Sequence, residues 1–281
     1  MAKYLLGAFS DEYSSEIVEQ VKALNEYGIG YMEVRGVNGK NVSVLDKREV
    51  KELKNVLDGS GIKASSIGSP LGKINIESDL NAHFELANRV FETANELGAK
   101  RVRMFSFYVP NKKEEYKGKV LFSLEQLAKL SEKHGVILCH ENEADIYGES
   151  PEKCLEILEY FGGKIKCVFD MGNFVLDGYE PFSAYQMLKA HIEYFHIKDS
   201  LSAGAIVPAG KGEAKIKEIL KDYSLAMQKD TFITLEPHLQ TFSGFNALTN
   251  KSFDNPFKYE NQKCAFTDAV NNFNKILGEI L

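Results

Sequence analysis

Short apolar runs alternate with longer amphipathic segments along the whole chain. Most of these runs are rich in Val, Ile, Leu or Phe, which is typical of a buried β-strand. The segments between the runs place Leu, Ile and Ala three or four residues apart, which predicts helices with one apolar face. The predicted strands are residues 3–9, 31–35, 63–68, 101–107, 136–141, 166–170, 194–199 and 231–236. The predicted helices are residues 14–28, 46–61, 79–98, a segment ending near 134, 150–162, a segment within 181–191, a segment near 214–222 and a last one in 264–281.

Eight consecutive strand–helix units predict a parallel sheet with right-handed crossovers. Ser150 followed by Pro151 suits the first turn of a helix, and glycines stand where several of the predicted helices end. Eight units without a break in composition favour a closed (β/α)8 TIM barrel, one α/β domain over residues 1–281. No GxGxxG follows the first strand, which disfavours a dinucleotide-binding fold.

Composition and charge narrow the classes of function. The 281 residues are 44% hydrophobic and 26% charged, which is typical of a soluble globular protein. The net charge of −6 disfavours a nucleic-acid partner, because phosphate contacts need clustered Lys and Arg. The four cysteines form no CxxC pair, so neither a disulfide framework nor a zinc ribbon is indicated. We find no apolar signal segment and no membrane span, and we expect a cytoplasmic enzyme, monomeric or homo-oligomeric.

Four chemically active residues stand at the carboxyl ends of successive predicted strands: Glu141, Asp170, His196 and Glu236. Any one of them, taken alone, has a structural explanation, because acids at strand ends commonly cap the next helix. In a barrel, however, the carboxyl ends of the strands surround one cavity. Three carboxylates there are unfavourable without a cation or added protons. We therefore predict one divalent metal ion, Mn²⁺ or Mg²⁺ before Zn²⁺ or Co²⁺, since oxygen ligands dominate.

Several longer motifs in the second half of the chain fit this prediction. They are HENEADIYGESPEKCLEIL (140–158), VFDMGNF (168–174), FHIKD (195–199), VPAGKGE (207–213) and LEPHL (235–239). Through them the chain resembles the xylose isomerase-like TIM barrel superfamily, and within it the sugar phosphate isomerase/epimerase family. The resemblance implies an enzyme that acts on a small carbohydrate and holds a divalent ion through the same four residues.

The resemblance also implies a mechanism. A metal ion that chelates the carbonyl and a neighbouring hydroxyl of a sugar acidifies the C–H between them and stabilises an enediolate. Glu141 and Glu236 are then both ligands and acid/base groups, because two carboxylates on opposite sides of the substrate can remove and return a proton. Return to the opposite face gives epimerisation, and return to the adjacent carbon gives isomerisation.

Five further residues are predicted to contact the substrate. Lys198 shares the inward face of its strand with His196, and His238 stands in the same relation to Glu236. Glu33 and Arg35 end the second strand, and Asn173 follows the aspartate ligand by three residues. Solvated or structural side chains are the alternative for each. Asp199 either orients His196 or Lys198 or caps a helix, and the N–H groups of Gly210 and Gly212 either bind a phosphate or form a plain turn.

The chain departs from well-known ketose 3-epimerases at positions near the substrate. Those enzymes carry a His at the position of Asn173, an Arg at that of Ser202 and a Glu at that of Tyr147. The metal ligands and the acid/base pair are kept, so the resemblance still implies enolisation. Epimerisation of a free ketose is the activity that these differences disfavour.

Three other functions remain open. A keto-sugar or inosose dehydratase, a lyase on the same scaffold, begins with the same proton abstraction and then expels water. An endonuclease IV-like hydrolase needs more histidine ligands than this chain offers, because only one or two of its six His residues are well placed. An inactive carbohydrate-binding module is the last. Residues 239–262 form a long loop after the eighth strand and are either a lid over the site or a packed surface loop.

Overall fold

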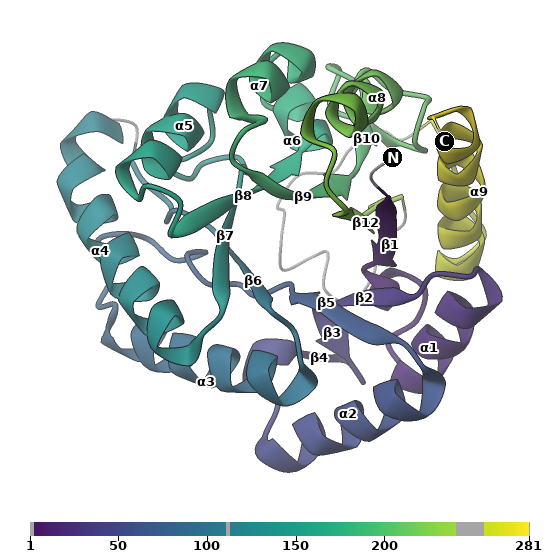
Figure 1. The fold of residues 1–281 in the computed structure, drawn as a ribbon, viewed down its shortest axis with the longest axis horizontal. Coiled ribbons are helices and arrows are strands. Elements are labelled where there is room, and N and C mark those ends of the chain that lie inside the picture. The colour runs from purple at the N-terminus through teal and green to yellow at the C-terminus, as the bar shows by residue number, and fades with distance from the viewer. Residues whose placement is uncertain (1–2, 111–112, 240–255, 281) are drawn as a thin grey trace.

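Eight parallel strands close into one barrel, and helices surround it (Figure 1). The structure is a computed structural model and describes residues 3–110, 113–239 and 256–280. Around the barrel the strands follow the order β1-β12-β9-β8-β7-β6-β5-β2. Their bounds are β1 (Tyr4–Ala8), β2 (Tyr31–Val34), β5 (Lys63–Ile67), β6 (Arg101–Met104), β7 (Ile137–Glu141), β8 (Ile165–Asp170), β9 (Ile192–Ile197) and β12 (Thr231–Leu235). The predicted (β/α)8 TIM barrel is therefore confirmed.

Each predicted helix is present, with ends within a few residues of the expected ones. The helices are α1 (Ile17–Glu26), α2 (Lys47–Ser60), α3 (Asn81–Leu97), α4 (Lys113–His134), α5 (Pro151–Tyr160), α7 (Pro181–Leu188), α8 (Ile216–Met227) and α9 (Gln262–Ile280). Ser150 caps α5 as predicted, because its hydroxyl accepts the N–H of Lys153. The caps of α2 and α3 at Gly61 and Gly98 have the left-handed conformation that glycine adopts without strain.

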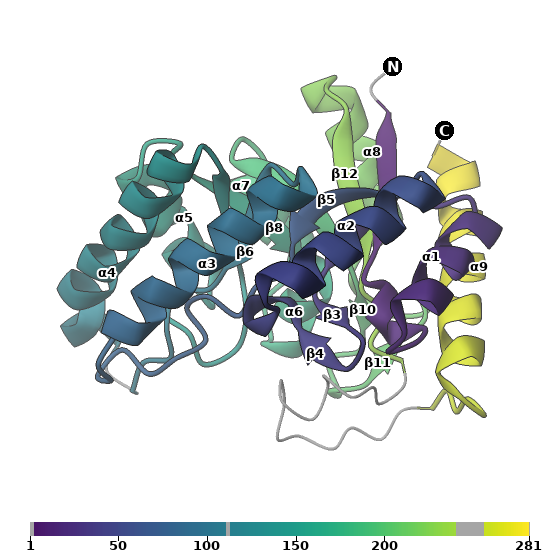
Figure 2. The same ribbon diagram turned by 90° about the horizontal axis from the view of Figure 1, so that it is seen from below.

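Short elements at the carboxyl end of the barrel were missed, because they are too short to show a hydrophobic period. They are α6 (Met171–Leu176), the hairpin of β3 (Gly36–Val37) and β4 (Lys40–Asn41), and the hairpin of β10 (Asp199–Ser200) and β11 (Ile206–Val207). Figure 2 shows both hairpins at the end of the barrel opposite the N-terminus. Residues 240–255 of the predicted lid lie outside the described residues.

A small apolar layer crosses the middle of the barrel. Cys139, Val168 and Tyr194 point inward from β7, β8 and β9 and pack together, with Phe232 of β12 against them. This layer separates two polar ends. At the amino end Arg101 stacks on the ring of Phe232, and at the carboxyl end the predicted metal ligands follow.

Candidate metal centre

The four predicted ligands converge at the carboxyl end of the barrel. Glu141 and Asp170 are the last residues of β7 and β8. His196 is the last but one residue of β9, and Glu236 directly follows β12. All four are buried. One ligand atom from each lies within 4.8 Å of one from every other, close enough to share a metal ion. The predicted grouping is thus present in the structure.

The imidazole of His196 and the ammonium group of Lys198 contact the three carboxylates of this cluster. His196 Nδ1 lies 2.9 Å from Glu141 Oε1 and 3.2 Å from Glu236 Oε2. Lys198 Nζ lies 2.8 Å from Asp170 Oδ2 and 3.2 Å from Glu236 Oε2. The N–H groups of His196 and Lys198 therefore supply positive charge among these carboxylates, as a bound metal ion would.

The donor set fits a divalent ion. Glu141 Oε2 and Glu236 Oε2 are buried and accept no hydrogen bond from the described residues, which is costly for a carboxylate oxygen. Three carboxylates and one imidazole suit Mn²⁺, Mg²⁺, Zn²⁺ or Co²⁺. Carboxylates also outnumber cations around the site. The cations are Arg35, Arg103 and Lys198, and the carboxylates are Asp11, Glu12, Glu33, Glu141, Asp170 and Glu236. A divalent ion would offset most of that excess.

The pKa values reflect this crowding. Burial lowers the pKa of His196, but the charges of Glu141 and Glu33 outweigh it and hold that pKa well above its ordinary value. Burial raises the pKa of Asp170 to about 7, although Lys198 opposes it. Burial also acts against ionised Glu141, yet His196 and Arg103 lower its pKa to about 2. Without a cation the cluster therefore retains protons on His196 and Asp170 that a metal ion must displace.

Glu33 lies directly behind His196. Its Oε2 is 3.1 Å from His196 Nε2 and accepts the hydroxyl of Thr234 at 2.8 Å, while its Oε1 accepts the hydroxyl of Tyr194 at 2.9 Å. A carboxylate on Nε2 keeps the proton there and leaves the Nδ1 lone pair for a cation. We therefore propose that Glu33 positions the imidazole, whereas the substrate contact that the sequence suggested is untested.

Glu33→Gln should weaken Mn²⁺ binding about 10- to 100-fold, as loss of a charged partner behind a histidine ligand usually does. Calorimetric titration with Mn²⁺ measures the affinity. Tyr194→Phe is the matched control, because it removes a hydrogen bond to Glu33 and leaves the contact with His196 in place. A Glu33→Gln protein with wild-type affinity, or a larger loss in Tyr194→Phe, would contradict the positioning role.

Arg35 joins the end of β2 to the end of β12. Its guanidinium bonds Asp11 through Nε and Nη2, Glu12 through Nη2 and Glu236 through Nη1 at 2.9 Å. His238 Nε2 lies 3.3 Å from the same Nη1. Glu12, Glu236 and His238 also have ligand atoms within 4.8 Å of one another. Because Arg35 contacts all three, a cation already occupies this group, and we assign no second metal ion there.

Lys198 and Asn173 lie together beside the metal ligands. Lys198 Nζ donates to Asn173 Oδ1 at 3.1 Å and to Asp170 Oδ2. The backbone N–H of Asn173 donates to Asp170 Oδ1, so this candidate ligand also caps helix α6. These contacts place both residues at the site, where their binding of substrate remains a prediction.

Asp199 has a different partner from those considered. Its carboxylate accepts the N–H groups of Gly210, Gly212 and Ala214, so it holds the loop 207–213 and does not bond His196 or Lys198. The glycine N–H groups are thus engaged within the protein. A Cβ atom at Gly212 would lie 2.2 Å from Asp199 Oδ1, which explains the need for glycine.

Arg103 was missed by the sequence analysis. It lies near the end of β6 and its Nη1 is 3.1 Å from Glu141 Oε2. Arg101 and Arg103 stand two apart in one strand, and two arginines on the same face of a barrel strand are the signal that could have revealed it. Asp11 and Glu12, in the loop after β1, were missed as well, because loop acids carry no period.

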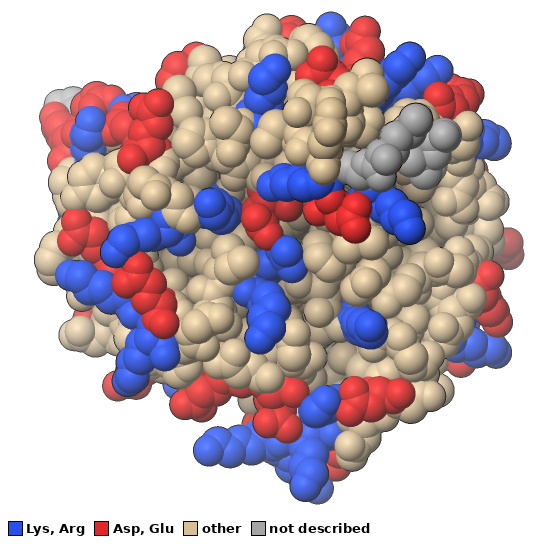
Figure 3. Space-filling model, in the orientation of Figure 1, with Lys and Arg blue, Asp and Glu red and all other residues tan. Residues whose placement is uncertain are grey.

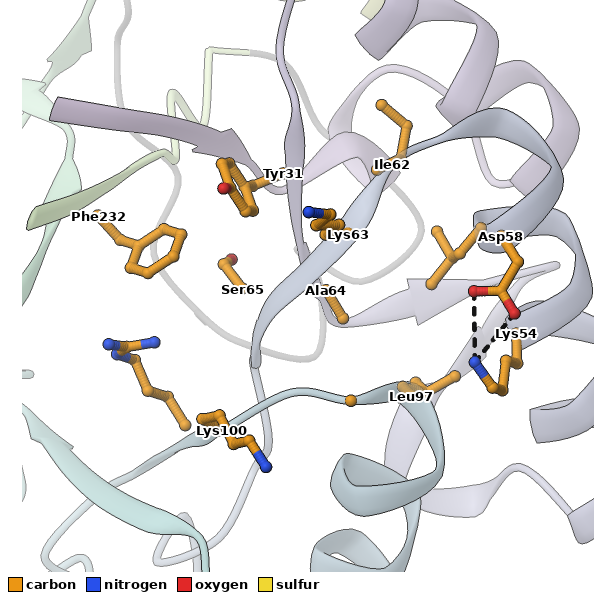
Figure 4. Close-up of a pocket in the computed structure, with 13 residues that line it drawn as sticks. Tyr31, Lys54, Asp58, Ile62, Lys63, Ala64, Ser65, Leu97, Lys100 and Phe232 are labelled. Carbon is orange, nitrogen blue, oxygen red and sulfur yellow. Dashed lines mark hydrogen bonds and ion pairs between the residues drawn. The ribbon is translucent and has the colours of Figure 1, made fainter. Parts of the chain in front are cut away.

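A pocket of about 360 Å³ lies at the opposite, amino end of the barrel (Figure 4). The rings of Tyr31 and Phe232 contact each other edge to face there, with centroids 4.9 Å apart, and Lys54 pairs with Asp58. In the view of this face, Lys, Arg, Asp and Glu side chains gather near its centre (Figure 3). None of the four metal ligands lines this pocket, so we place the chemistry at the other end.

Comparisons with known proteins agree with this fold. The family model for the xylose isomerase-like TIM barrel matches residues 21–247. No curated protein sequence matches the chain. Among the described residues, every helix is too short or too polar to cross a bilayer.

Solved structures of low sequence identity share the architecture. D-psicose 3-epimerase from Clostridium cellulolyticum H10, solved with D-tagatose, is 14% identical with a TM-score of 0.75, over 97% of this chain and 98% of that one. The IolI protein, solved with a zinc atom, is 18% identical with a TM-score of 0.75, over 98% of this chain and 99% of that one. The probable 3-DHS dehydratase AsbF from Bacillus anthracis is 17% identical with a TM-score of 0.72, over 97% and 98%. At these identities the likeness shows the fold.

Proposed function

Because the chain belongs to the xylose isomerase-like TIM barrel family, we propose that it is a divalent-metal-dependent isomerase or epimerase of a sugar or sugar derivative. The observation that carries this proposal is the convergence of Glu141, Asp170, His196 and Glu236 within 4.8 Å. The solved relatives include epimerases of sugars, which supports the substrate class. Mn²⁺ or Mg²⁺ is the preferred ion, because three of the four donors are carboxylates.

We propose that two of the four residues, Glu141 and Glu236, move the proton. Around the barrel β7 and β12 are separated by β9 and β8, so Glu141 and Glu236 lie on two sides of the cavity, with Asp170 and His196 between them. Burial opposes their ionisation, but neighbouring cations lower the pKa of both carboxyls, so both are ionised at neutral pH and able to accept a proton. The bound ion would supply the positive charge that acidifies the C–H beside the substrate carbonyl.

The surrounding residues determine which carboxylate orientation is kept. Arg35 Nη1 holds Glu236 Oε1 at 2.9 Å, and Lys198 contacts Glu236 Oε2. Glu236 is therefore fixed from both sides, whereas Glu141 is held by His196 and Arg103. We propose that this fixation aligns each carboxylate with one face of the substrate, which is what specific proton removal and return require.

A dehydratase is the second candidate. Asn173 stands where the ketose 3-epimerases carry a histidine, and it bonds Lys198 and Asn142. That difference near the substrate, together with the structural likeness to a probable dehydratase, favours this candidate over a hydrolase. Both reactions begin with removal of a proton beside a carbonyl, and only the dehydratase then loses water.

NMR in D₂O of the Mn²⁺-loaded protein tests the function with a panel of ketoses, aldoses and inososes, each as the neutral compound and as a phosphate or carboxylate derivative. We expect solvent deuterium to enter one carbon next to the carbonyl, because the proton returned comes from a carboxylate that exchanges with solvent. A product of unchanged mass, apart from deuterium, identifies an isomerase or epimerase, and loss of water identifies the dehydratase. Absence of exchange and of product across the panel would contradict the proposal.

A further inference from the structure

Arg103 is a buried guanidinium whose N–H groups form no hydrogen bond with the described residues. Its side chain is 5% exposed, and its Nε hydrogen has no acceptor in the described part of the chain. Nη1 lies 3.1 Å from Glu141 Oε2, yet that oxygen accepts no hydrogen bond, so the contact is an ion pair without hydrogen-bond alignment. The next carboxylate oxygen, Glu236 Oε1, is 3.7 Å away.

The two other buried cations of the site are different. Arg35 donates to Asp11, Glu12 and Glu236, and Lys198 donates to Asp170 and Asn173. Their donors are satisfied by the protein itself. Arg103 is equally buried, but residues 3–110, 113–239 and 256–280 provide its Nε hydrogen with no acceptor. Buried donors without acceptors are rare, because each costs free energy.

The surroundings of Arg103 keep its guanidinium in place. Its Cζ lies 5.2 Å from the ring centroid of Phe9 and 5.0 Å from that of Phe105. Lys73 Nζ lies 4.4 Å from the Phe105 centroid, so a second cation contacts the same ring. Lys73 is paired with Glu143 at 2.8 Å. Ring contacts orient a planar guanidinium without using its N–H groups.

An arginine held in this way suits an anion with two oxygens. Planar guanidinium groups bind carboxylates and phosphates through paired hydrogen bonds, which neutral hydroxyl groups do not match. The Glu141 contact places the Arg103 head group beside the metal ligands, where a substrate would lie. A neutral ketose offers the Arg103 guanidinium no pair of charged oxygens.

We propose that the substrate is anionic, with a carboxylate or phosphate close to its reacting carbonyl, and that Arg103 binds this group. The inference rests on the proposed function and specifies the substrate class. An anionic substrate also fits the differences between this chain and the ketose 3-epimerases at Asn173 and Ser202. Arg103 is then a specificity-determining residue that separates acidic from neutral substrates of the same reaction.

Calorimetry with three small probes tests the inference. Dihydroxyacetone, hydroxypyruvate and dihydroxyacetone phosphate share a carbonyl beside a hydroxyl, and they carry no charge, a carboxylate and a phosphate respectively. On the Mn²⁺-loaded protein we expect at least one anion to bind about tenfold or more tightly than the neutral probe, as a charge-assisted hydrogen bond provides. Which anion it is identifies the group.

Arg103→Gln should remove this preference, so that neither anion binds more tightly than dihydroxyacetone to the same variant. Arg101→Gln is the matched control, because Arg101 lies on the same strand but pairs with Glu193 at the amino end. Equal affinity for all three probes, no binding of either anion, or a preference that persists in Arg103→Gln would overturn the inference. If no Mn²⁺ binds at all, the proposed function fails, and the same titrations on the metal-free protein still measure the anion preference.

Discussion

Glu141→Gln and Glu236→Gln are each expected to abolish measurable turnover while the barrel stays folded. Removal of a general acid or base costs about 10²- to 10⁴-fold in rate, and weaker binding of the metal ion adds to the loss. The fold should persist, because Gln keeps the size of Glu and relieves repulsion among buried carboxylates. Initial rates on the substrate identified by deuterium exchange measure turnover, and circular dichroism reports folding.

Glu193→Gln is the control for these two variants. Glu193 is also a partly buried glutamate on a barrel strand, but it pairs with Arg101 at the amino end. It should keep wild-type turnover. Substantial activity in Glu141→Gln or Glu236→Gln at saturating Mn²⁺ would show that another group moves the proton.

Addition of Mn²⁺ to metal-free protein should raise the melting temperature by several degrees. An ion at 1,000 times its dissociation constant stabilises the folded state by about 4 kcal/mol, and about 1 kcal/mol shifts the melting temperature by roughly 2–4 °C in domains approaching this size. Differential scanning calorimetry with and without Mn²⁺ measures the shift. Asp170→Asn should reduce it, because a carboxylate ligand becomes a neutral amide.

The size of this Mn²⁺ effect should increase with pH. Burial raises the pKa of Asp170 to about 7 and that of Glu12 to about 8, above the ordinary values of 3.8 and 4.5. Such groups contribute their full stabilisation at pH values below the pKa that they have in the unfolded protein. This contribution is lost as the pH rises through the pKa that they have in the folded protein. Metal-free protein should thus become less stable from pH 5 to pH 8. Mn²⁺ competes with the proton on Asp170, so the Mn²⁺-induced shift in melting temperature should be larger at pH 8 than at pH 6. The opposite trend would contradict the assignment.

The fold and the convergence of the four candidate ligands could be predicted from sequence, because both follow from periodicity. A strand is visible as an apolar run, and barrel geometry brings the residues after successive runs to one cavity. Glu141 and Glu236 were predicted in this way although 95 positions separate them.

Residues defined by contacts alone could not be predicted. Nothing in the sequence indicates that Arg35 bonds both Asp11 and Glu236, or that Asp199 faces a glycine turn. Arg103 was overlooked because strand interiors are expected to be apolar, and a charge there is noticed only when its direction is known. Glu33 was recognised as a strand-end acid, but its position behind His196 needed the coordinates.

The apolar layer of Cys139, Val168 and Tyr194 divides the barrel into two electrostatic compartments. The amino-end pocket shares no residue with the metal centre, so substitutions at the two ends should add in their effects. Substitutions that stabilise the protein can therefore be placed around the amino-end pocket without replacing a residue of the candidate metal centre.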